Sequence, residues 1–259
     1  MKVVILAGGL GTRLGEETDV RPKPMVEIGG KPILWHIMKG YSQHGFNEFV
    51  ILLGYKGYLI KEFFANYFLH QGDVTIDLAD NRVEVHRNKS EPWKVTLVET
   101  GLSTQTGGRL LAARDYLKEG DFMLTYGDGV SDVDVTALVA HHQANPQALV
   151  TMTTVQPEAR FGMVQTDEAG FIRDFREKPP GDLGWINGGF MVCRQGVFDY
   201  LKEGEGTIFE RAPLEQIAGD GRLLNWPHHG FWKCMDTLRD KIQLNQMWDQ
   251  DQARWKTWS

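Results

Sequence analysis

Short apolar runs alternate along this chain with longer stretches in which apolar residues recur every three or four positions. The short runs predict buried strands at residues 3–7, 49–53, 95–98, 122–126 and 149–155. The longer stretches predict helices from about residue 31 to 45, from 57 to 67, at 109–117 and at 135–142. Because strands that alternate with helices form a sheet covered on both faces, we expect an α/β, Rossmann-like doubly wound fold with a mostly parallel mixed sheet.

Two segments depart from this alternation. Residues 74–85 alternate apolar and polar positions around Asp80-Asn81, and residues 162–175 do the same around residues 167–170. A period of two predicts small β-ribbons, which we interpret as excursions from the main sheet. No Pro/Gly/Ser-rich linker interrupts the chain, so we expect a single domain over residues 1–259.

Composition and charge exclude several classes of protein. The net charge of -6 gives no basic surface for nucleic acid, so no nucleic-acid partner is expected. Cys193 and Cys234 have neither metal-ligand spacing nor the pattern of a disulfide framework. The first apolar run is too short for a signal peptide, and no run is long enough to span a membrane. We therefore expect a cytoplasmic protein with no membrane partner.

The most informative segment joins the first strand to a glycine-rich turn, Gly8-Gly9-Leu10-Gly11-Thr12-Arg13, and ten residues later to Lys23. Glycines at the end of a strand expose backbone N–H groups to an anion, and the two side chains add positive charge, which indicates a polyphosphate ligand. A dinucleotide fingerprint needs glycine where Leu14 stands, and a P-loop needs a Gly-Lys pair that is absent at the required spacing. Both of those alternatives fail.

The turn, together with Pro22-Lys23-Pro24, resembles the signature of the sugar-phosphate nucleotidyltransferases, also called nucleotide-sugar pyrophosphorylases. The resemblance implies that Arg13 and Lys23 take part in catalysis, that Lys23 also binds the nucleotide, and that the turn wraps a nucleotide. The nucleotide-binding residues implied for the turn are Leu6, Ala7, Gly8, Gly9, Leu10, Gly11, Thr12 and Arg13.

A second candidate centre is Tyr126-Gly127-Asp128-Gly129, in which a carboxylate follows a strand directly. An EF-hand loop would need Asp or Asn at position 130, which is Val, so the pattern fails. The resemblance implies that Asp128 takes part in catalysis, binds the nucleotide and holds Mg²⁺ together with Asp236. The alternative for Asp236 is a helix N-cap, and Asp132 and Asp134 are interpreted as a turn residue and a helix cap.

A third candidate centre is Glu177-Lys178-Pro179, followed by Asn187-Gly188-Gly189. A Glu-Lys pair at a strand end is usually a solvated rim. The resemblance instead implies a sugar-phosphate site, in which Glu177 and Asn187 bind hydroxyl groups, Lys178 binds the phosphate and Gly188 leaves room for the sugar ring.

The two substrates would bring roughly six negative charges together, which requires several cationic groups. We expect Arg13, Lys23, Lys178 and Mg²⁺ to act jointly. The reaction is then an in-line attack by the sugar phosphate on the α-phosphorus of the nucleotide. A phosphate is already ionised at neutral pH, so no protein base is needed, and the eight histidines are expected at the surface or in packing.

The resemblance narrows to the glucose-1-phosphate cytidylyltransferases through residues 91–101, Thr106-Gly107-Gly108-Arg109, Gly230-Phe231-Trp232 and residues 235–241. It implies CTP and α-D-glucose 1-phosphate as substrates and CDP-glucose as product, at the entry to deoxysugars of surface polysaccharides such as O-antigen. Thr104, Gly107 and Arg109 would lie near base and ribose. The alternatives are a relative that uses dTTP or UTP, and a non-catalytic sugar-nucleotide-binding regulator.

The C-terminal segment is unusually aromatic, with Trp248, Trp255 and Trp258 in its last twelve residues. Bulky aromatic residues near a chain end need a surface to cover them. They could fold back on their own domain, or the helix and tail at about 237–259 could contact a neighbouring subunit. The resemblance favours the second, and we expect a homo-oligomer, for which a hexamer is one candidate.

Overall fold

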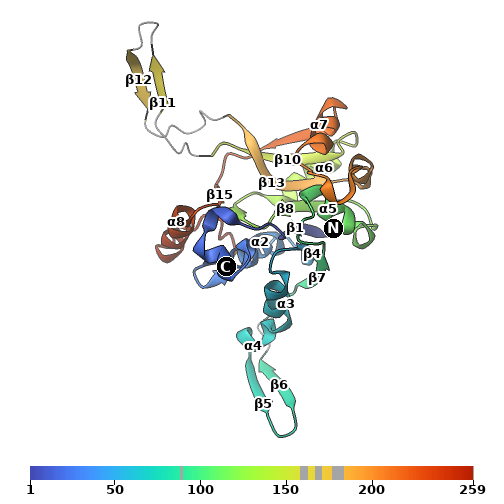
Figure 1. The fold of residues 1–259 in the computed structure, drawn as a ribbon, viewed down its shortest axis with the longest axis vertical. Coiled ribbons are helices and arrows are strands. Elements are labelled where there is room, and N and C mark those ends of the chain that lie inside the picture. The colour runs from blue at the N-terminus through green and yellow to red at the C-terminus, as the bar shows by residue number, and fades with distance from the viewer. Residues whose placement is uncertain (88–89, 158–162, 167–170, 177–183, 259) are drawn as a thin grey trace.

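The computed structural model describes residues 1–87, 90–157, 163–166, 171–176 and 184–258. A seven-stranded sheet with the order β14-β10-β13-β8-β1-β4-β7 forms its centre. Strand β1 runs parallel to β4 and β8, whereas β13 runs antiparallel to β8 and β10. The expected α/β fold with a mixed, mostly parallel sheet is confirmed (Figure 1). The strands are β14 (Leu223–Pro227), β10 (Val150–Val155), β13 (Ile186–Cys193), β8 (Phe122–Tyr126), β1 (Val3–Leu6), β4 (Glu48–Leu53) and β7 (Lys94–Glu99).

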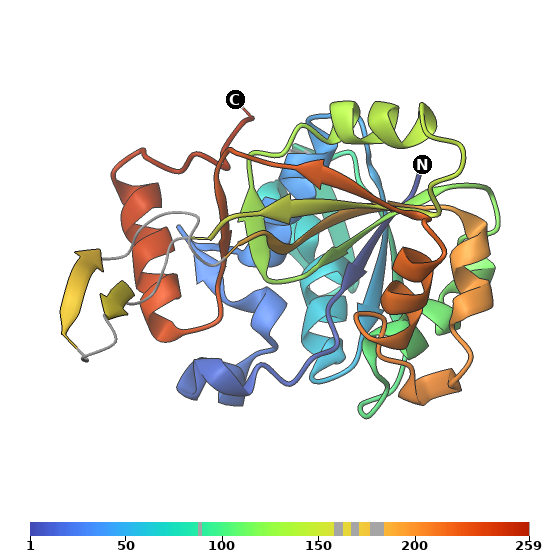
Figure 2. The ribbon, with the colours of Figure 1, turned by 90° about the horizontal axis from the view of Figure 1, so that it is seen from above.

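Helices cover both faces of the sheet (Figure 2). The α-helices are α1 (Glu16–Val20), α2 (Ile33–Ser42), α3 (Gly57–Ala65), α4 (Tyr67–Gln71), α5 (Thr106–Ala112), α6 (Val135–Gln143), α7 (Ala212–Gly219) and α8 (Leu238–Asp249). The short 3₁₀ helices are η1 (Thr12–Leu14), η2 (Lys23–Met25), η3 (Arg114–Tyr116), η4 (Gln195–Tyr200) and η5 (Gly204–Gly206).

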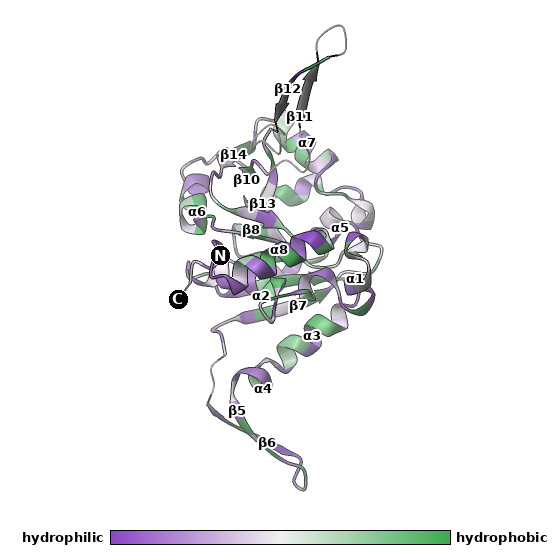
Figure 3. Cartoon of the chain, turned by 90° about the vertical axis from the view of Figure 1, so that its left-hand side faces the viewer, coloured by the Kyte–Doolittle hydropathy of each residue, from purple (hydrophilic) through white to green (hydrophobic). Residues whose placement is uncertain are grey.

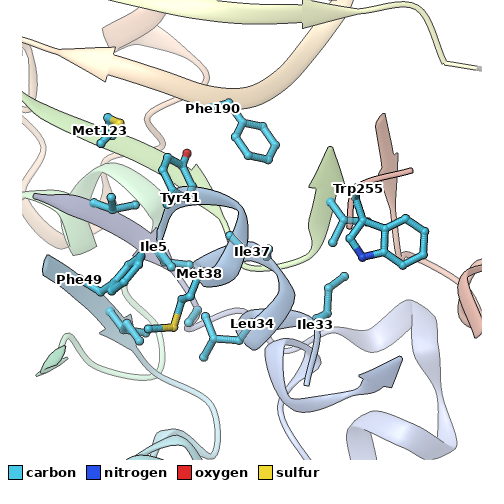
Figure 4. Close-up of a cluster of buried hydrophobic side chains, with 14 of the residues drawn as sticks. Ile5, Ile33, Leu34, Ile37, Met38, Tyr41, Phe49, Met123, Phe190 and Trp255 are labelled. Carbon is cyan, nitrogen blue, oxygen red and sulfur yellow. The ribbon is translucent and has the colours of Figure 1, made fainter. Parts of the chain in front are cut away.

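The sheet separates two hydrophobic clusters because successive strand residues point to opposite faces. Val3 and Ile5 of β1 join the cluster formed with α2, α6 and α8, whereas Val4 joins the cluster formed with α5 and α7. Figure 4 shows part of the first cluster, with Tyr41 of α2 beside Phe190 of β13. Burial of both faces accounts for the continuous apolar runs in the central strands.

Two predicted helices have different bounds in the structure. The stretch predicted at 109–117 forms α5 from Thr106 and then η3. The earlier start depends on a distant loop, because the N–H groups of Gly107 and Gly108 both donate to the carbonyl of Thr207. The stretch predicted from 57 to 67 is divided at Asn66, whose side chain donates back to the carbonyl of Glu62.

Both predicted β-ribbons are present and lie at opposite ends of the molecule (Figure 1). One is formed by β5 (Asp73–Asp77) and β6 (Arg82–Arg87), the other by β11 (Met163–Thr166) and β12 (Ile172–Arg176). Figure 3 shows that β5 and β6 extend away from the body beyond α4. Two further short pairs are β2 (Glu27–Ile28) with β3 (Lys31–Pro32), and β9 (Gly129–Ser131) with β15 (Trp232–Cys234). No helix in the described part of the chain is long and apolar enough to cross a membrane.

The C-terminal tryptophans fold back on their own domain. Trp255 is 1% exposed, stacks on Phe231 and donates from Nε1 to Nδ1 of His36 at 3.4 Å. Trp248 and Trp258 also pack against the ring of His36. These contacts are those of the alternative in which the side chains cover their own domain, with Trp255 buried and Trp248 and Trp258 partly buried. Contact of the tail with a second subunit stays a prediction.

Candidate active site

The glycine-rich turn lies at the carboxyl edge of the sheet, where parallel α/β sheets bind their ligands. The turn is attached to the neighbouring strands on both sides, since Ala7 N donates to Leu52 O at 3.0 Å and Gly127 N donates to Leu6 O at 2.9 Å. Gly8 has no room for a side chain, because a Cβ there would lie 2.2 Å from the guanidinium of Arg109. Gly11 has a φ of +65°, which glycine adopts without strain.

A cavity of about 570 Å³ opens beside this turn. Of the predicted nucleotide-binding residues, all but Gly107 line it, and so does Asp236. Seven further lining residues were not predicted to bind the nucleotide, although four of them belong to the sequence motifs. Several of them follow the carboxyl ends of β7 and β8, where ligand-binding loops are expected once the strand order is known. They are Pro24, Leu102, Ser103, Gln105, Thr106, Tyr126 and Gly127.

Lys23 joins the two carboxylates that were predicted to hold a metal ion. Its Nζ lies 2.6 Å from Oδ2 of Asp128 and 2.5 Å from Oδ1 of Asp236. Burial alone would lower the pKa of Lys23, but the two carboxylates raise it above its ordinary value. Arg13 adds a second positive charge 3.6 Å from Asp236, on a side chain that is largely exposed. Four charged groups predicted from distant parts of the sequence therefore meet at one point.

The position of Asp236 follows from a short β-ladder. Cys234 of β15 pairs with Gly129 of β9, and Met235 N donates to Asp128 O at 2.9 Å, which places the two aspartates next to each other. The N-cap of α8 is Thr237, whose hydroxyl accepts from Asp240 N in a capping box. The alternative in which Asp236 serves as the helix cap is therefore wrong.

The donor set fits a hard divalent cation such as Mg²⁺. Asp128 and Asp236 already converge on one positively charged group, and carboxylate oxygens are the ligands that Mg²⁺ prefers. Among the described residues, this site included, no group of three or more His, Cys, Asp or Glu side chains could hold a metal ion, so these two carboxylates would need further ligands. Two carboxylates with phosphate oxygens and water is the usual arrangement for Mg²⁺ bound with a nucleotide.

Arg109 connects the walls of the cavity. Its side chain is buried, and burial lowers its pKa. Its guanidinium donates to oxygens of three segments, namely Gly8 O in the turn, Leu53 O at the end of β4, and Thr100 Oγ1, Gly101 O and Leu102 O after β7. Because its donors are largely engaged within the protein, the geometry supports a positioning role, and contact with base or ribose stays a prediction.

The remaining predicted residues divide into described and undescribed ones. Glu177 and Lys178 lie outside the described residues. Asn187 lies beside the cavity and donates from Nδ2 to the hydroxyl of Tyr126 at 3.0 Å. Gly188 is required by the sheet itself, because a Cβ there would lie 2.8 Å from Cγ1 of Val155. A role for Gly188 in leaving room for the sugar stays a prediction.

The other carboxylates of this region have structural partners. Asp134 caps α6 by accepting from Ala137 N at 2.9 Å, as predicted. Asp132 accepts from Phe231 N and lies 2.9 Å from Nε2 of His228. These contacts join the segments that flank β9 and β15, and so support the ladder that places Asp236.

Comparison with known proteins assigns the family. Residues 2–233 match the family described as nucleotidyl transferase. The chain belongs to that family. The glucose-1-phosphate cytidylyltransferase of Salmonella typhi is 55% identical to this nucleotidyl transferase over 259 residues, the full length of both chains. The probable glucose-1-phosphate cytidylyltransferase of Bacillus subtilis (strain 168) is 46% identical over 258 residues, again over the full length of both.

Solved structures agree on the fold. HddC from Yersinia pseudotuberculosis superposes with a TM-score of 0.69 at 23% identity, covering 95% of this chain and 99% of that one. A UDP-glucose pyrophosphorylase complexed with UDP-glucose also gives 0.69, at 16% identity, covering 96% and 98% of the two chains. At these identities the likeness establishes the fold of the nucleotidyl transferase and nothing about its substrate.

Proposed function

We propose that this nucleotidyl transferase moves the cytidylyl group of CTP to α-D-glucose 1-phosphate, giving CDP-glucose and pyrophosphate. The observation that carries the proposed chemistry is the convergence of Arg13, Lys23, Asp128 and Asp236 beside a glycine-rich turn in one cavity. The choice of CTP and glucose 1-phosphate is supported by the full-length relatives from Salmonella typhi and Bacillus subtilis.

In this proposal the turn and its two cations bind the triphosphate. Backbone N–H groups after β1 face the phosphates, and the largely exposed Arg13 contributes a positive charge from the cavity rim. The ammonium of Lys23 leaves the carboxylates for the phosphate. Asp128 and Asp236 would hold Mg²⁺, which would supply positive charge to neutralise the transferring phosphate.

The chain's task in the chemical step is to position the reactants. An oxygen of the sugar phosphate attacks the α-phosphorus in line, and pyrophosphate leaves. No proton has to be removed from the nucleophile, so no side chain acts as a base. On the sugar side we propose that Glu177 and Asn187 bind hydroxyl groups and that Lys178 binds the phosphate.

A pyrophosphate-release assay tests the proposal, with CTP, dTTP, UTP, ATP and GTP offered in turn with glucose 1-phosphate. We expect turnover with CTP to exceed that with each other nucleotide. Preference for dTTP or UTP would refute the choice of base and leave the reaction type intact. Asp128→Asn and Asp236→Asn should each reduce turnover by at least 100-fold with the fold retained, since each removes a ligand of the neutralising ion.

We also propose that the enzyme acts as a cytoplasmic homo-oligomer, with a hexamer as one candidate, and feeds the synthesis of surface polysaccharides. The family resemblance supports this, whereas the tail gives little support, because Trp255 is buried within one chain and Trp248 and Trp258 pack against His36 of the same chain. Light scattering on the full chain measures the mass directly. A monomer at micromolar concentration would overturn the proposal.

A further inference from the structure

Glu210, which belongs to none of the predicted sites, connects two walls of the cavity. It lies in the loop before α7, and each of its carboxylate oxygens accepts a hydrogen bond from a hydroxyl group. Thr106, at the start of α5, donates to Oε2 at 2.6 Å, and Tyr126, at the end of β8, donates to Oε1 at 2.8 Å. Both hydroxyl-bearing residues line the cavity.

The hydrogen bonds continue from Tyr126 to Asn187. Nδ2 of Asn187 donates to the Tyr126 hydroxyl at 3.0 Å, and its Oδ1 accepts from Gly189 N at 2.9 Å. The backbone bends closely around the tyrosine ring here, because Gly189 has a φ of +74° and a Cβ on it would lie 3.1 Å from Cδ2 of Tyr126. The amide of Asn187 is thus fixed at both ends.

The carboxylate of Glu210 determines which group donates and which accepts in each hydrogen bond of this network. A carboxylate can only accept, so Glu210 requires the Tyr126 hydroxyl to donate, and its lone pair then faces the amide of Asn187. One N–H of Asn187 is consequently engaged, and the orientation of the other is determined by the protein.

We infer that Glu210 and Tyr126 are positioning residues for sugar recognition. They hold the Asn187 amide in one orientation, so that it can hydrogen-bond only a sugar whose hydroxyl groups match that orientation. The inference rests on the proposed function, since it concerns the same sugar-phosphate site. A site built to hydrogen-bond a hydroxyl discriminates strongly between substrates only if its polar groups are held in place. The hydroxyl of Thr106, at the start of α5, donates to the same Glu210 carboxylate, so the network also contacts the segment that carries Arg109.

The test compares Tyr126→Phe and Glu210→Gln with the wild-type enzyme. Phenylalanine keeps the ring and removes the hydroxyl, and glutamine keeps the size and offers one acceptor oxygen in place of two. Tyr200→Phe is the matched control, because Tyr200 also donates to a carboxylate, Oδ2 of Asp220 at 2.7 Å, on the exposed surface. Steady-state kinetics are measured with CTP and with glucose 1-phosphate or its C4 epimer, galactose 1-phosphate.

We expect Tyr126→Phe to raise the KM for glucose 1-phosphate about 5- to 10-fold, with the KM for CTP changed less than about 2-fold. Glu210→Gln should act in the same direction, and the ratio of kcat/KM for glucose 1-phosphate over galactose 1-phosphate should fall in both. The double variant should lose no more kcat/KM for glucose 1-phosphate than the more impaired single variant, because Glu210 acts on Asn187 through Tyr126. Tyr200→Phe should match wild type.

Three outcomes would overturn the inference. The first is that both variants keep the wild-type KM for glucose 1-phosphate and the wild-type preference for it over galactose 1-phosphate. The second is that the KM values for CTP and for glucose 1-phosphate rise equally. The third is that the losses of kcat/KM add up in the double variant. A melting temperature near that of wild type for Tyr126→Phe confirms that folding is not the cause. A wild-type enzyme without turnover on CTP and glucose 1-phosphate would refute the proposed function and this inference with it.

Discussion

Removal of Lys23 should tighten the binding of a divalent cation in the absence of nucleotide. In the structure the Lys23 ammonium contacts both Asp128 and Asp236 and occupies the point on which the two carboxylates converge. A cation can bind those oxygens only after it displaces the ammonium. Lys23→Ala removes this competitor and leaves two adjacent negative charges.

The size of the effect can be worked out from the distances. Both oxygens bond to the same nitrogen, so they lie no more than about 5 Å apart, where two charges repel by about 3 kcal/mol at an effective dielectric near 20. Relief of that repulsion corresponds to about 100-fold in affinity. The side chains of Asp128 and Asp236 are 31% and 23% exposed, so water screens part of this repulsion. We therefore expect the affinity for the divalent cation to rise about 10- to 50-fold.

Electron paramagnetic resonance with Mn²⁺ as the probe gives the affinity at pH 7.5 without nucleotide. Lys39→Ala is the matched control, because Lys39 forms a comparably buried ion pair with Glu91 at 3.0 Å. Lys23→Ala should bind Mn²⁺ more tightly than wild type while its turnover falls. Adding Asp236→Asn to Lys23→Ala should abolish the gain.

Unchanged or weaker Mn²⁺ binding in Lys23→Ala would refute this reasoning, since the ammonium would then not compete with the ion. An equal gain in Lys39→Ala would also refute it, because the effect would then reflect the net charge of the protein. If the gain is found, Lys23 keeps the two carboxylates neutralised until a triphosphate arrives to receive its charge.

Three further predictions concern stability. Burial lowers the pKa of His36 and His142 to about 4, so below pH 6.5 the unfolded chain binds more protons than the folded one. The free energy of unfolding in urea should therefore fall between pH 6.5 and 4, by up to roughly 3 kcal/mol per histidine, and a flat profile would contradict this. Gly188→Ala should lower the free energy of unfolding by about 1–3 kcal/mol, because the alanine Cβ would collide with Val155. If the variant is as stable as wild type, the strand shifts to make room for the Cβ. Trp255→Ala should cost about 3–5 kcal/mol without changing the mass in light scattering, and a lower mass with the fold retained would place this residue in a subunit contact.

Local signals in the sequence predicted five of the seven strands of the central sheet, all but β13 and β14, and part of the candidate site. The runs of β1 and β4 are continuous and apolar because these central strands are buried on both faces, which a short window reveals. The turn from Gly8 to Arg13 and the residue Lys23 were also found locally, because glycine spacing and charge identify an anion site before any tertiary contact is known. These residues line the cavity, and their contact with a nucleotide stays a prediction.

Only the tertiary structure decided which residues act on one another across the chain. Asp236 and Thr237 both suit a helix N-cap, and the ladder of β15 with β9 settled that Asp236 faces Lys23 while Thr237 caps the helix. Glu210 carried no local signal, since its partners Tyr126 and Thr106 are more than eighty residues away along the chain. Hydrogen bonds and ion pairs depend on distances of about 3 Å, and a sequence pattern fixes those only within a helix turn or a strand. Contacts between distant elements form only when the strands pair in their final register, so only the folded structure shows which residues meet.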